Sequence, residues 1–410
     1  MSPTKFAIRN QGCWRNWART NCWRCCCSVL RPRRHVAYNL ADAEIHCRRH
    51  GRIETVPNTT PGLVCAHHHL YSSLARGMPA PPTAPTKFIE VLQQVWWRLD
   101  AALDADMIYW SAALGAVEAL MNGTTAIIDH HESPNMIEGS LSLISKACSD
   151  VGVRVNTCYG VTDRWDNNGQ LHSKVSPLSK MTDAAQRGLA ECERFIAGGG
   201  AGMIGVHSAF TCCDETLNAA ADMAKRLNVG VHIHVAEGED DAHAATRLAK
   251  LATDDWLLVH GVHLKSPLLG RLVHNPRSNM NNHVGYGAPT SKSNTILLGT
   301  DGIGADMLEE SRLAYARLRE FNIAETPDTV SQWLNNAYQI FPEAEHDTVT
   351  WNYDQIQSPW HVAFTPGTRV TDVVIDNQAV IRDGLPTRVD LHEIRSKAHE
   401  QALRLFERLQ

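Results

Sequence analysis

Short apolar runs alternate with helical stretches over most of this 410-residue chain. From residue 61 onward, each apolar run ends on a polar residue, and residues at helical spacing follow most of the runs. Eight strand ends counted in this way fall near residues 69, 130, 160, 207, 234, 260, 274 and 301. Alternating strands and helices favour a parallel sheet. Eight such units predict an α/β fold, a closed (β/α)8 barrel of the TIM type.

The last third of the chain departs from this alternation. Only 13 residues separate His260 from His274, so the sixth crossover helix is expected to be very short or absent. Residues 371–382 predict two strands around Asp376-Asn377, a plausible hairpin turn. Residues 390–408 carry apolar side chains at helical spacing and predict a terminal amphipathic helix outside the barrel.

The first 60 residues differ in composition from the rest. They hold eleven Lys/Arg against three Asp/Glu, and six of the twelve cysteines lie before residue 48. Their C-x-x-C spacing lacks a second ligand pair at a standard distance for zinc, although the composition also suits an organelle transit peptide. A degenerate or misread terminus is the interpretation we favour.

Charge and hydropathy restrict the class of partner. The net charge of −5 argues against a general nucleic-acid or membrane-surface binder. No apolar run approaches the roughly 20 residues of a membrane helix. Because no secretory signal pattern is recognised at the start, we expect a cytoplasmic enzyme.

Metal-ligand residue types gather at the predicted strand ends. Residues i and i+2 of a strand share a face, so His67 and His69 point together into the barrel mouth, whereas His68 points away. His234 and Asp301 end two further strands. Three imidazoles and a carboxylate suit one divalent ion, zinc before iron. Each motif alone is weak evidence, because 21 histidines will produce such pairs by chance. Their shared position at the strand ends carries more weight, because the active sites of such barrels lie at this face.

Proton carriers follow the same strands. Glu237, three residues after His234, can take a proton from the attacking water and return it to the leaving amine. His260 ends an apolar run and is preferred over His263, a loop residue, as the group that stabilises developing charge. Asp301 can also accept a proton. His232 lies deeper and is interpreted as a core or supporting histidine.

Together these residues carry a resemblance to the amidohydrolase superfamily, in its guanine deaminase and chlorohydrolase branch, and most closely to the aminohydrolases called SsnA. The resemblance covers about residues 61–342, and a weaker similarity extends over residues 358–385. Its motifs are PGLVCAHHHL (61–70), HVAE (234–237), HGVHL (260–264), HNPRSN (274–279) and GTDG (299–302).

The resemblance implies a (β/α)8 barrel that holds one metal. His67, His69, His234 and Asp301 take the ligand roles, with Glu237 and His260 as acid/base and polarising groups. The bridging lysine of dinuclear branches has no counterpart in residues 203–208. Family members use positions after the strands to hold heterocycles, and loop structure or helix capping is the alternative role for them. The positions here are Arg76, Asp163, His207, Phe210, Asn275 and Asn279.

The implied domain arrangement has three parts. Residues 1–60 form an atypical segment that is either part of a small β domain or disordered, and residues 61–342 form the hydrolase barrel. Residues 343–410 supply C-terminal strands and the last helix. The family's small β-sandwich, built from both termini, is expected to be incomplete here. Relatives are often homodimers.

The expected activity is hydrolysis of an amino group from a small heterocycle of the purine, pteridine or triazine type, with release of ammonia. A related hydrolase that opens a cyclic amide or displaces chloride or an alkylamine is the first alternative. An inactive, truncated metal-binding remnant is the second, because the terminal regions depart from the family pattern.

Overall fold

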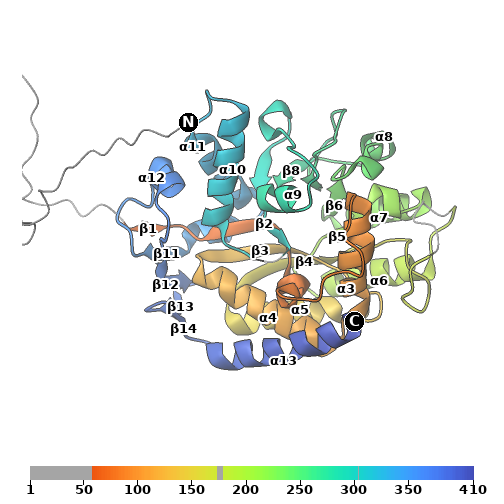
Figure 1. Cartoon of the computed structure of the whole chain (residues 1–410), viewed down its shortest axis with the longest axis horizontal. Coiled ribbons are helices and arrows are strands. Elements are labelled where there is room, and N and C mark those ends of the chain that lie inside the picture. The colour runs from red at the N-terminus through yellow and green to blue at the C-terminus, as the bar shows by residue number, and fades with distance from the viewer. Residues whose placement is uncertain (1–57, 173–178, 303) are drawn as a thin grey trace, which may run out of the picture. The chain divides into compact units, whose positions relative to one another are not determined.

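A barrel of parallel strands forms the centre of the chain in this computed structural model, which describes residues 58–172, 179–302 and 304–410 (Figure 1). Hydrogen bonds join the strands in two runs, β10-β2-β3-β4 and β5-β6-β7-β8-β9. Bridges from Thr157 to Gly202 and from Val161 to Val206 connect β4 with β5. The barrel strands are β2 (Leu63–His69), β3 (Thr124–His131), β4 (Arg154–Tyr159), β5 (Ile204–Ser208), β6 (Val231–Val235), β7 (Leu257–His260), β8 (Arg271–His274), β9 (Ile296–Leu298) and β10 (Asp301–Gly302).

The predicted TIM-type barrel is confirmed, including its short sixth crossover. Residues 261–270 form only turns and bends, and β7 pairs directly with β8 in parallel. The Cys-rich and basic part of the N-terminal segment lies outside the described residues, so its interpretation stays a prediction.

Small apolar side chains fill the barrel interior. One buried cluster takes residues of one parity from β2, β3, β4, β7, β8 and β9, and Ala337, Phe341 and Ala344 belong to the same cluster. Its members on the strands are Val64, Ala66, Ala126, Ile128, Cys158, Leu257, Val259, Val273 and Leu297. The layer is apolar and tightly packed, so polar chemistry is confined to the strand ends above it.

Helices cover the outside of the barrel, and their ends follow local sequence signals. Asp104 caps α4 by accepting a hydrogen bond from the backbone N–H of Met107, and that helix ends at Asn122-Gly123. The helix α7 runs from Asp214 to Leu227 and ends at Asn228, which has a left-handed conformation (φ 56°). The helices are α2 (Phe88–Val91), α3 (Trp97–Ala102), α4 (Ala105–Met121), α5 (Ser140–Val151), α6 (Asp183–Ala197), α7 (Asp214–Leu227), α8 (Ala244–Leu248), α9 (Pro276–Asn281), α10 (Met307–Phe321), α11 (Pro327–Asn335), α12 (Pro359–Phe364) and α13 (Leu391–Leu409).

A small antiparallel sheet lies beside the barrel (Figure 1). Its order is β1-β11-β12-β13-β14, in which only β1 comes from before the barrel. The predicted hairpin is present, because Asp376 and Asn377 both have positive φ and join β12 to β13. The strands are β1 (Thr59–Thr60), β11 (Thr348–Trp351), β12 (Val370–Ile375), β13 (Gln378–Arg382) and β14 (Leu385–Pro386).

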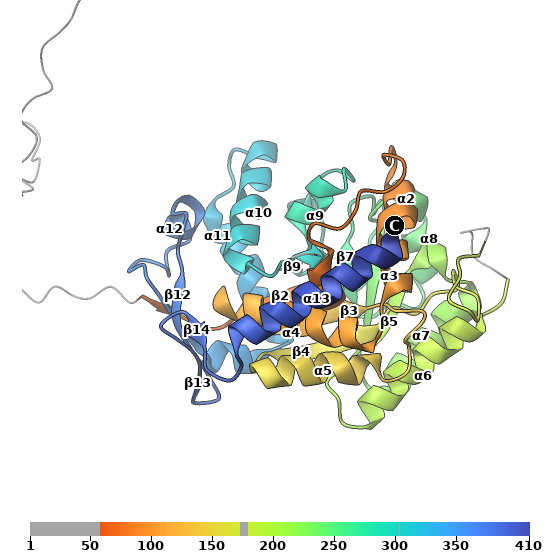
Figure 2. The ribbon, with the colours of Figure 1, turned by 60° about the horizontal axis from the view of Figure 1, so that its bottom comes forward.

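The terminal helix α13 runs across the outside of the barrel against α4 (Figure 2). Asp390 caps its first turn. Arg404 and Arg408 both reach the carboxylate of Asp104, at 2.7 and 2.6 Å. Among the helices of the described ranges, none combines the length and apolarity that crossing a membrane requires.

Candidate metal centre

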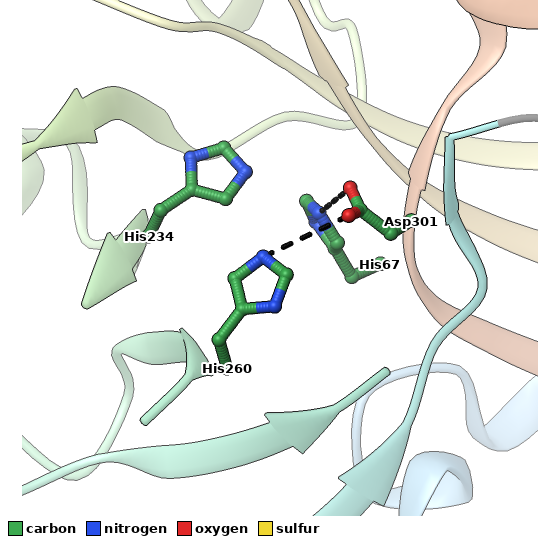
Figure 3. A group of neighbouring side chains, drawn as sticks. All are labelled: His67, His234, His260 and Asp301. Atoms are coloured by element: carbon green, nitrogen blue, oxygen red, sulfur yellow. Dashed lines mark hydrogen bonds and ion pairs between the residues drawn. The ribbon is translucent and has the colours of Figure 1, made fainter. Parts of the chain in front are cut away.

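Four buried side chains converge where the barrel strands end (Figure 3). Each of His67, His234, His260 and Asp301 offers a ligand atom, and these atoms lie within 4.8 Å of one another. His67 comes from β2, and Asp301 lies beside that strand because it pairs with His68 in parallel. His234 and His260 come from the ends of β6 and β7.

His69 completes the group at comparable distances. Its Nε2 lies 3.0 Å from Asp301 Oδ1 and 3.3 Å from His234 Nε2. His67 Nε2 lies 3.1 Å from the same carboxylate oxygen. Donors about 2.1 Å from a tetrahedral zinc ion are about 3.4 Å apart, so this spacing fits one shared ion. The structure thus brings all four sequence-predicted ligands together.

Backbone carbonyls fix the tautomers of two of these histidines. His69 Nδ1 donates to the carbonyl of His130 (2.6 Å), and His234 Nδ1 donates to that of His207 (2.7 Å). Because a carbonyl can only accept, the Nδ1 atom of each ring carries a proton, which leaves Nε2 as the nitrogen that can bind an ion. This is the arrangement of metal-ligating histidines, whose other ring nitrogen donates to a carbonyl or a carboxylate.

His67 is oriented by the deeper histidine, His232. The His67 Nδ1 and His232 Nε2 atoms are 2.8 Å apart, which leaves His67 Nε2 facing Asp301. His232 is fully buried, as expected for a supporting histidine. His68 points away, with its Nδ1 2.9 Å from Thr300 Oγ1.

Burial and Asp301 set opposite protonation states within the centre. Burial lowers the pKa of His67 well below its ordinary value. Burial also lowers that of His69, but its hydrogen bond and charge contact with Asp301 outweigh this effect and raise the pKa to about 9. A metal-free centre therefore keeps a proton on His69 at neutral pH, which a metal ion would displace.

Glu237 lies at the edge of the centre, next to His260. The Glu237 Oε2 and His260 Nε2 atoms are 3.3 Å apart, and Asn282 donates to Glu237 Oε1 at 3.3 Å. Burial raises the pKa of Glu237 to about 7, against the lowering effect of His260. A carboxyl group with this pKa can both take up and release a proton at neutral pH.

The backbone is strained at two of these positions. His260 (φ 71°) and Asp301 (φ 59°) both adopt left-handed conformations. Non-glycine residues so placed cost about 1–3 kcal/mol each and gather at functional sites. Gly299 lies two residues before Asp301, and a Cβ there would lie 2.8 Å from the carbonyl oxygen of His67. The glycine therefore allows the backbone before Asp301 to approach the strand that carries His67.

A pocket with an empty volume of about 680 Å³ opens onto the centre. His69, His234, Glu237 and Asp301 line its inner end. Its walls carry aromatic side chains that can hold a flat ring between their faces. These side chains are Tyr71, Phe88, Trp96, Trp97 and Phe210.

The six sequence-predicted substrate contacts separate into three groups. His207 and Phe210 line the pocket. Asn275 and Asn279 instead surround His260, with Asn279 Oδ1 2.8 Å and the Asn275 side-chain amide 3.4 Å from His260 Nδ1.

The other two, Asp163 and Arg76, do not line this pocket. Asp163 accepts hydrogen bonds from the backbone N–H groups of Thr182 and Cys213. These bonds fit the alternative role of loop structure or helix capping rather than substrate contact. Arg76 pairs with Glu118 at 2.7 Å in a separate surface hollow.

Sequence reasoning missed the pocket wall built by residues 88–100. Phe88, Trp96, Trp97 and Asp100 all line the pocket from the segment that follows the first barrel strand. The adjacent Trp96-Trp97 pair in the segment after a ligand-bearing strand was the available signal, since aromatic side chains commonly line ligand pockets. It also missed Ser278, whose hydroxyl donates to Asp301 Oδ2.

Known proteins resemble the chain in sequence. A model of the Amidohydrolase family matches residues 58–336. A 5'-deoxyadenosine deaminase from Methanococcus vannielii is 24% identical over 390 residues, covering 84% of this chain and 88% of the relative. A 5-methylthioadenosine/S-adenosylhomocysteine deaminase from Desulfitobacterium hafniense is 23% identical over 390 residues, covering 83% and 85%.

Solved structures share the fold. An adenosine deaminase from Xanthomonas campestris with bound zinc superposes with a TM-score of 0.67 at 18% identity, covering 85% of each chain. An atrazine chlorohydrolase from Arthrobacter aurescens, complexed with zinc, gives 0.65 at 18% identity, covering 84% of this chain and 88% of that one. The family model covers more than half of this sequence, and the chain belongs to the amidohydrolase family.

Proposed function

We propose that the chain is a metal-dependent aminohydrolase that converts an aminated heterocycle and water into the oxo heterocycle and ammonia. The observation that carries the proposal is the close approach of His67 and His69 Nε2 to Asp301, with His234 Nε2 next to His69 and with Glu237 next to His260. Three nitrogen donors and one carboxylate favour zinc over iron as the ion. When bound, the ion supplies Lewis acidity and lowers the pKa of water toward about 7.

The protein's own groups handle the protons. Glu237 takes a proton from the attacking water and passes it to a ring nitrogen or to the leaving amine, a role that suits its pKa near 7. His260 faces both Glu237 (3.3 Å) and Asp301 (3.8 Å), so it can steady the charge that develops between them. The aromatic walls hold the ring and exclude water.

The substrate class follows from the pocket and from the relatives. A flat heterocycle fits between the aromatic walls with its amino-bearing carbon toward the metal. Several relatives act, by their names, on adenosine derivatives. We therefore place adenine nucleosides first among the purine, pteridine and triazine candidates.

The Glu237→Gln variant tests the acid/base role. The zinc-loaded wild type should release ammonia from at least one member of a panel comprising adenosine, 5'-deoxyadenosine, guanine, a pterin and an aminotriazine. Glu237→Gln should lower kcat by about 10²–10⁴-fold while zinc content stays unchanged. Glu239→Gln, an exposed carboxylate two residues along, is the matched control and should keep full activity.

Product identification by mass spectrometry separates the alternatives. Release of chloride or alkylamine, or opening of a cyclic amide, would replace deamination with the related hydrolase. A folded, zinc-loaded chain inert on the whole panel would favour the inactive remnant. Full activity in Glu237→Gln would contradict the proposed acid/base role of Glu237.

A further inference from the structure

The β6 strand ends in a left-handed turn that directs Glu237. His234 faces the metal centre, whereas Val235 packs in the core between the strands and the helices. Strict alternation would place Ala236 inside the barrel and turn Glu237 outward, to the side of Val235. Ala236 has a φ of 47° instead and joins the outer core, so Glu237 turns back to within 3.3 Å of His260. The turn at Ala236 therefore decides where the proposed proton carrier points.

This turn is strained, and a buried carboxylate contacts it. A non-glycine residue with positive φ adopts an unfavourable backbone conformation, which persists only where its surroundings hold it. The Ala236 N–H donates to Asp241 Oδ2 at 2.7 Å, and the Ala236 carbonyl accepts from the N–H of His263 at 2.8 Å. A hydrogen bond to an ionised carboxylate is stronger than one between neutral groups. The bond to Asp241 can therefore offset the strain at Ala236.

Asp241 is tied to the neighbouring strand as well. It is 4% exposed, and its Oδ1 accepts from the N–H of Phe210 at 3.0 Å. The hydroxyl of Ser208 is also hydrogen-bonded to it. Phe210 and Ser208 lie where β5 ends, so one carboxylate joins the ends of β5 and β6. Burial raises the pKa of Asp241 to about 7, while its three hydrogen bonds all favour the charged form.

Asp241 lines the pocket, but both of its carboxylate oxygens accept hydrogen bonds from the chain itself. We propose that Asp241 is a positioning residue for Glu237, which holds the turn at Ala236 and thereby keeps the Glu237 carboxyl group next to His260. The inference rests on the proposed function, because that function makes Glu237 the proton carrier. Without the Asp241 carboxylate the turn relaxes, so proton transfer slows. Zinc binding stays nearly unchanged, because Asp241 contacts none of the proposed ligands.

Removal of the carboxylate tests the inference. Asp241→Ala should lower kcat on the best panel substrate by about 10–100-fold, with KM changed by less than about threefold, because a misplaced catalytic group slows the reaction more than it weakens binding. Zinc content per chain should stay at the wild-type value. The assay is run well above the Asp241 pKa of about 7, so that the wild-type side chain is charged. Asp240→Ala, the same change at the exposed neighbour, is the matched control and should leave kcat unchanged.

Ala236→Gly separates positioning from a general contribution to stability. Glycine adopts a positive φ without strain, so the turn then depends less on its partner. In the Asp241→Ala background, Ala236→Gly should raise kcat by about five- to tenfold, whereas in the wild-type background it should change kcat by less than about threefold. If Asp241→Ala does not fold, Asp241→Asn provides the same test. It keeps one acceptor oxygen for three donors, so kcat should again fall and recover with Ala236→Gly.

Hydrogen exchange of the Ala236 amide gives a readout that is independent of catalysis. It is resolved to single residues by mass spectrometry with electron-transfer fragmentation. Asp241→Ala removes the acceptor of this N–H, so its exchange in the zinc-loaded chain should become at least about tenfold faster. The amides within β6 should keep their exchange rates, because that strand stays paired with β5 and β7. Asp240→Ala should change neither.

Several results would overturn the inference. Wild-type kcat in Asp241→Ala would do so, as would a higher KM at constant kcat, which is the behaviour of a substrate contact. A kcat that falls only in proportion to lost zinc, no recovery with Ala236→Gly, or unchanged exchange of the Ala236 amide would do so too. If that exchange rises but no panel compound releases ammonia even from the wild type, the proposed function fails and the hold of Asp241 on the turn stands. Ammonia release with full activity in Asp241→Ala removes the positioning role alone.

Discussion

At the residue scale, the candidate centre depends on partners that the sequence does not reveal. The ligands themselves follow from the i, i+2 spacing of His67 and His69 and from the polar strand ends. The tautomers of His69 and His234 instead depend on the carbonyl oxygens of His130 and His207. Carbonyl groups carry no sequence signal, so only the structure shows that the two Nε2 atoms face each other.

The proton on His69 makes metal binding pH-dependent. Its pKa of about 9 is raised above the ordinary value, so the metal-free centre holds this proton at neutral pH and releases it when zinc binds. Zinc affinity should therefore rise with pH up to about 9, by about tenfold per pH unit. Competition with a chelator of known affinity at pH 6.5, 7.5 and 8.5 measures this slope. A zinc affinity that stays constant, once the chelator's own protonation is corrected for, would contradict the assignment.

Asn279 is expected to position His260 rather than to hold the substrate. Its Oδ1 accepts from His260 Nδ1 at 2.8 Å, which leaves Nε2 facing Glu237. Asn279→Ala should lower kcat by about 10–100-fold, the usual effect of losing such a supporting bond, with KM and zinc content nearly unchanged. Asn281→Ala, on an exposed face of the same helix, is the control. A rise in KM at constant kcat would instead make Asn279 a substrate contact.

At the element scale, local irregularities aim the functional side chains. Val64 and Ala66 face the barrel interior, so strict alternation would turn His68 inward. The pairing of β2 with β3 shifts between Cys65 and His68, and after this shift His67 and His69 face the centre. Bulges often redirect a side chain next to an active site in this way. The spacing predicted the shared face of His67 and His69, but not this shift.

The direction of the His260 side chain also could not be predicted from the alternation of side chains along a strand. Val259 faces the interior, so an extended His260 would point outward. Its left-handed backbone turns the imidazole back toward Asp301 instead. Similarly, the helical run from Phe88 to Ala102 contains a π-helical stretch at Leu92–Trp96, which interrupts the helical period of its side chains. The aromatic wall could therefore not be placed from the pattern alone.

The terminal helix α13 is expected to stabilise the barrel without taking part in the chemistry. Leu405 is fully buried against it, whereas Leu403 on the same helix is 50% exposed. Leu405→Ala should lower the free energy of unfolding by about 2–5 kcal/mol, the usual cost of such a cavity. Leu403→Ala should cost well under 1 kcal/mol. Thermal unfolding of the zinc-loaded variants measures both, and equal losses would contradict the packing.

At the scale of the whole molecule, the barrel was the most predictable part. Eight strand ends, the short 260–274 connection, the hairpin at Asp376-Asn377 and the last helix all follow from local patterns that the structure repeats. The small sheet was less predictable, because β1 has only two residues and pairs with β11, about 290 positions away. Pairing over such a distance leaves no periodic trace. The domain boundaries at residues 60 and 342 and the dimeric state stay predictions.

The molecule as described brings the candidate metal ligands, the proposed proton carrier Glu237 and the aromatic pocket to the same end of the barrel. Mass-spectrometric metal content per purified chain, followed with ammonia release as zinc is removed and restored, tests this account most directly. We predict about one zinc ion per chain, activity that falls in proportion to the zinc removed, and recovery when one equivalent is returned. Undiminished deamination by the zinc-free chain, or a requirement for two ions, would contradict it.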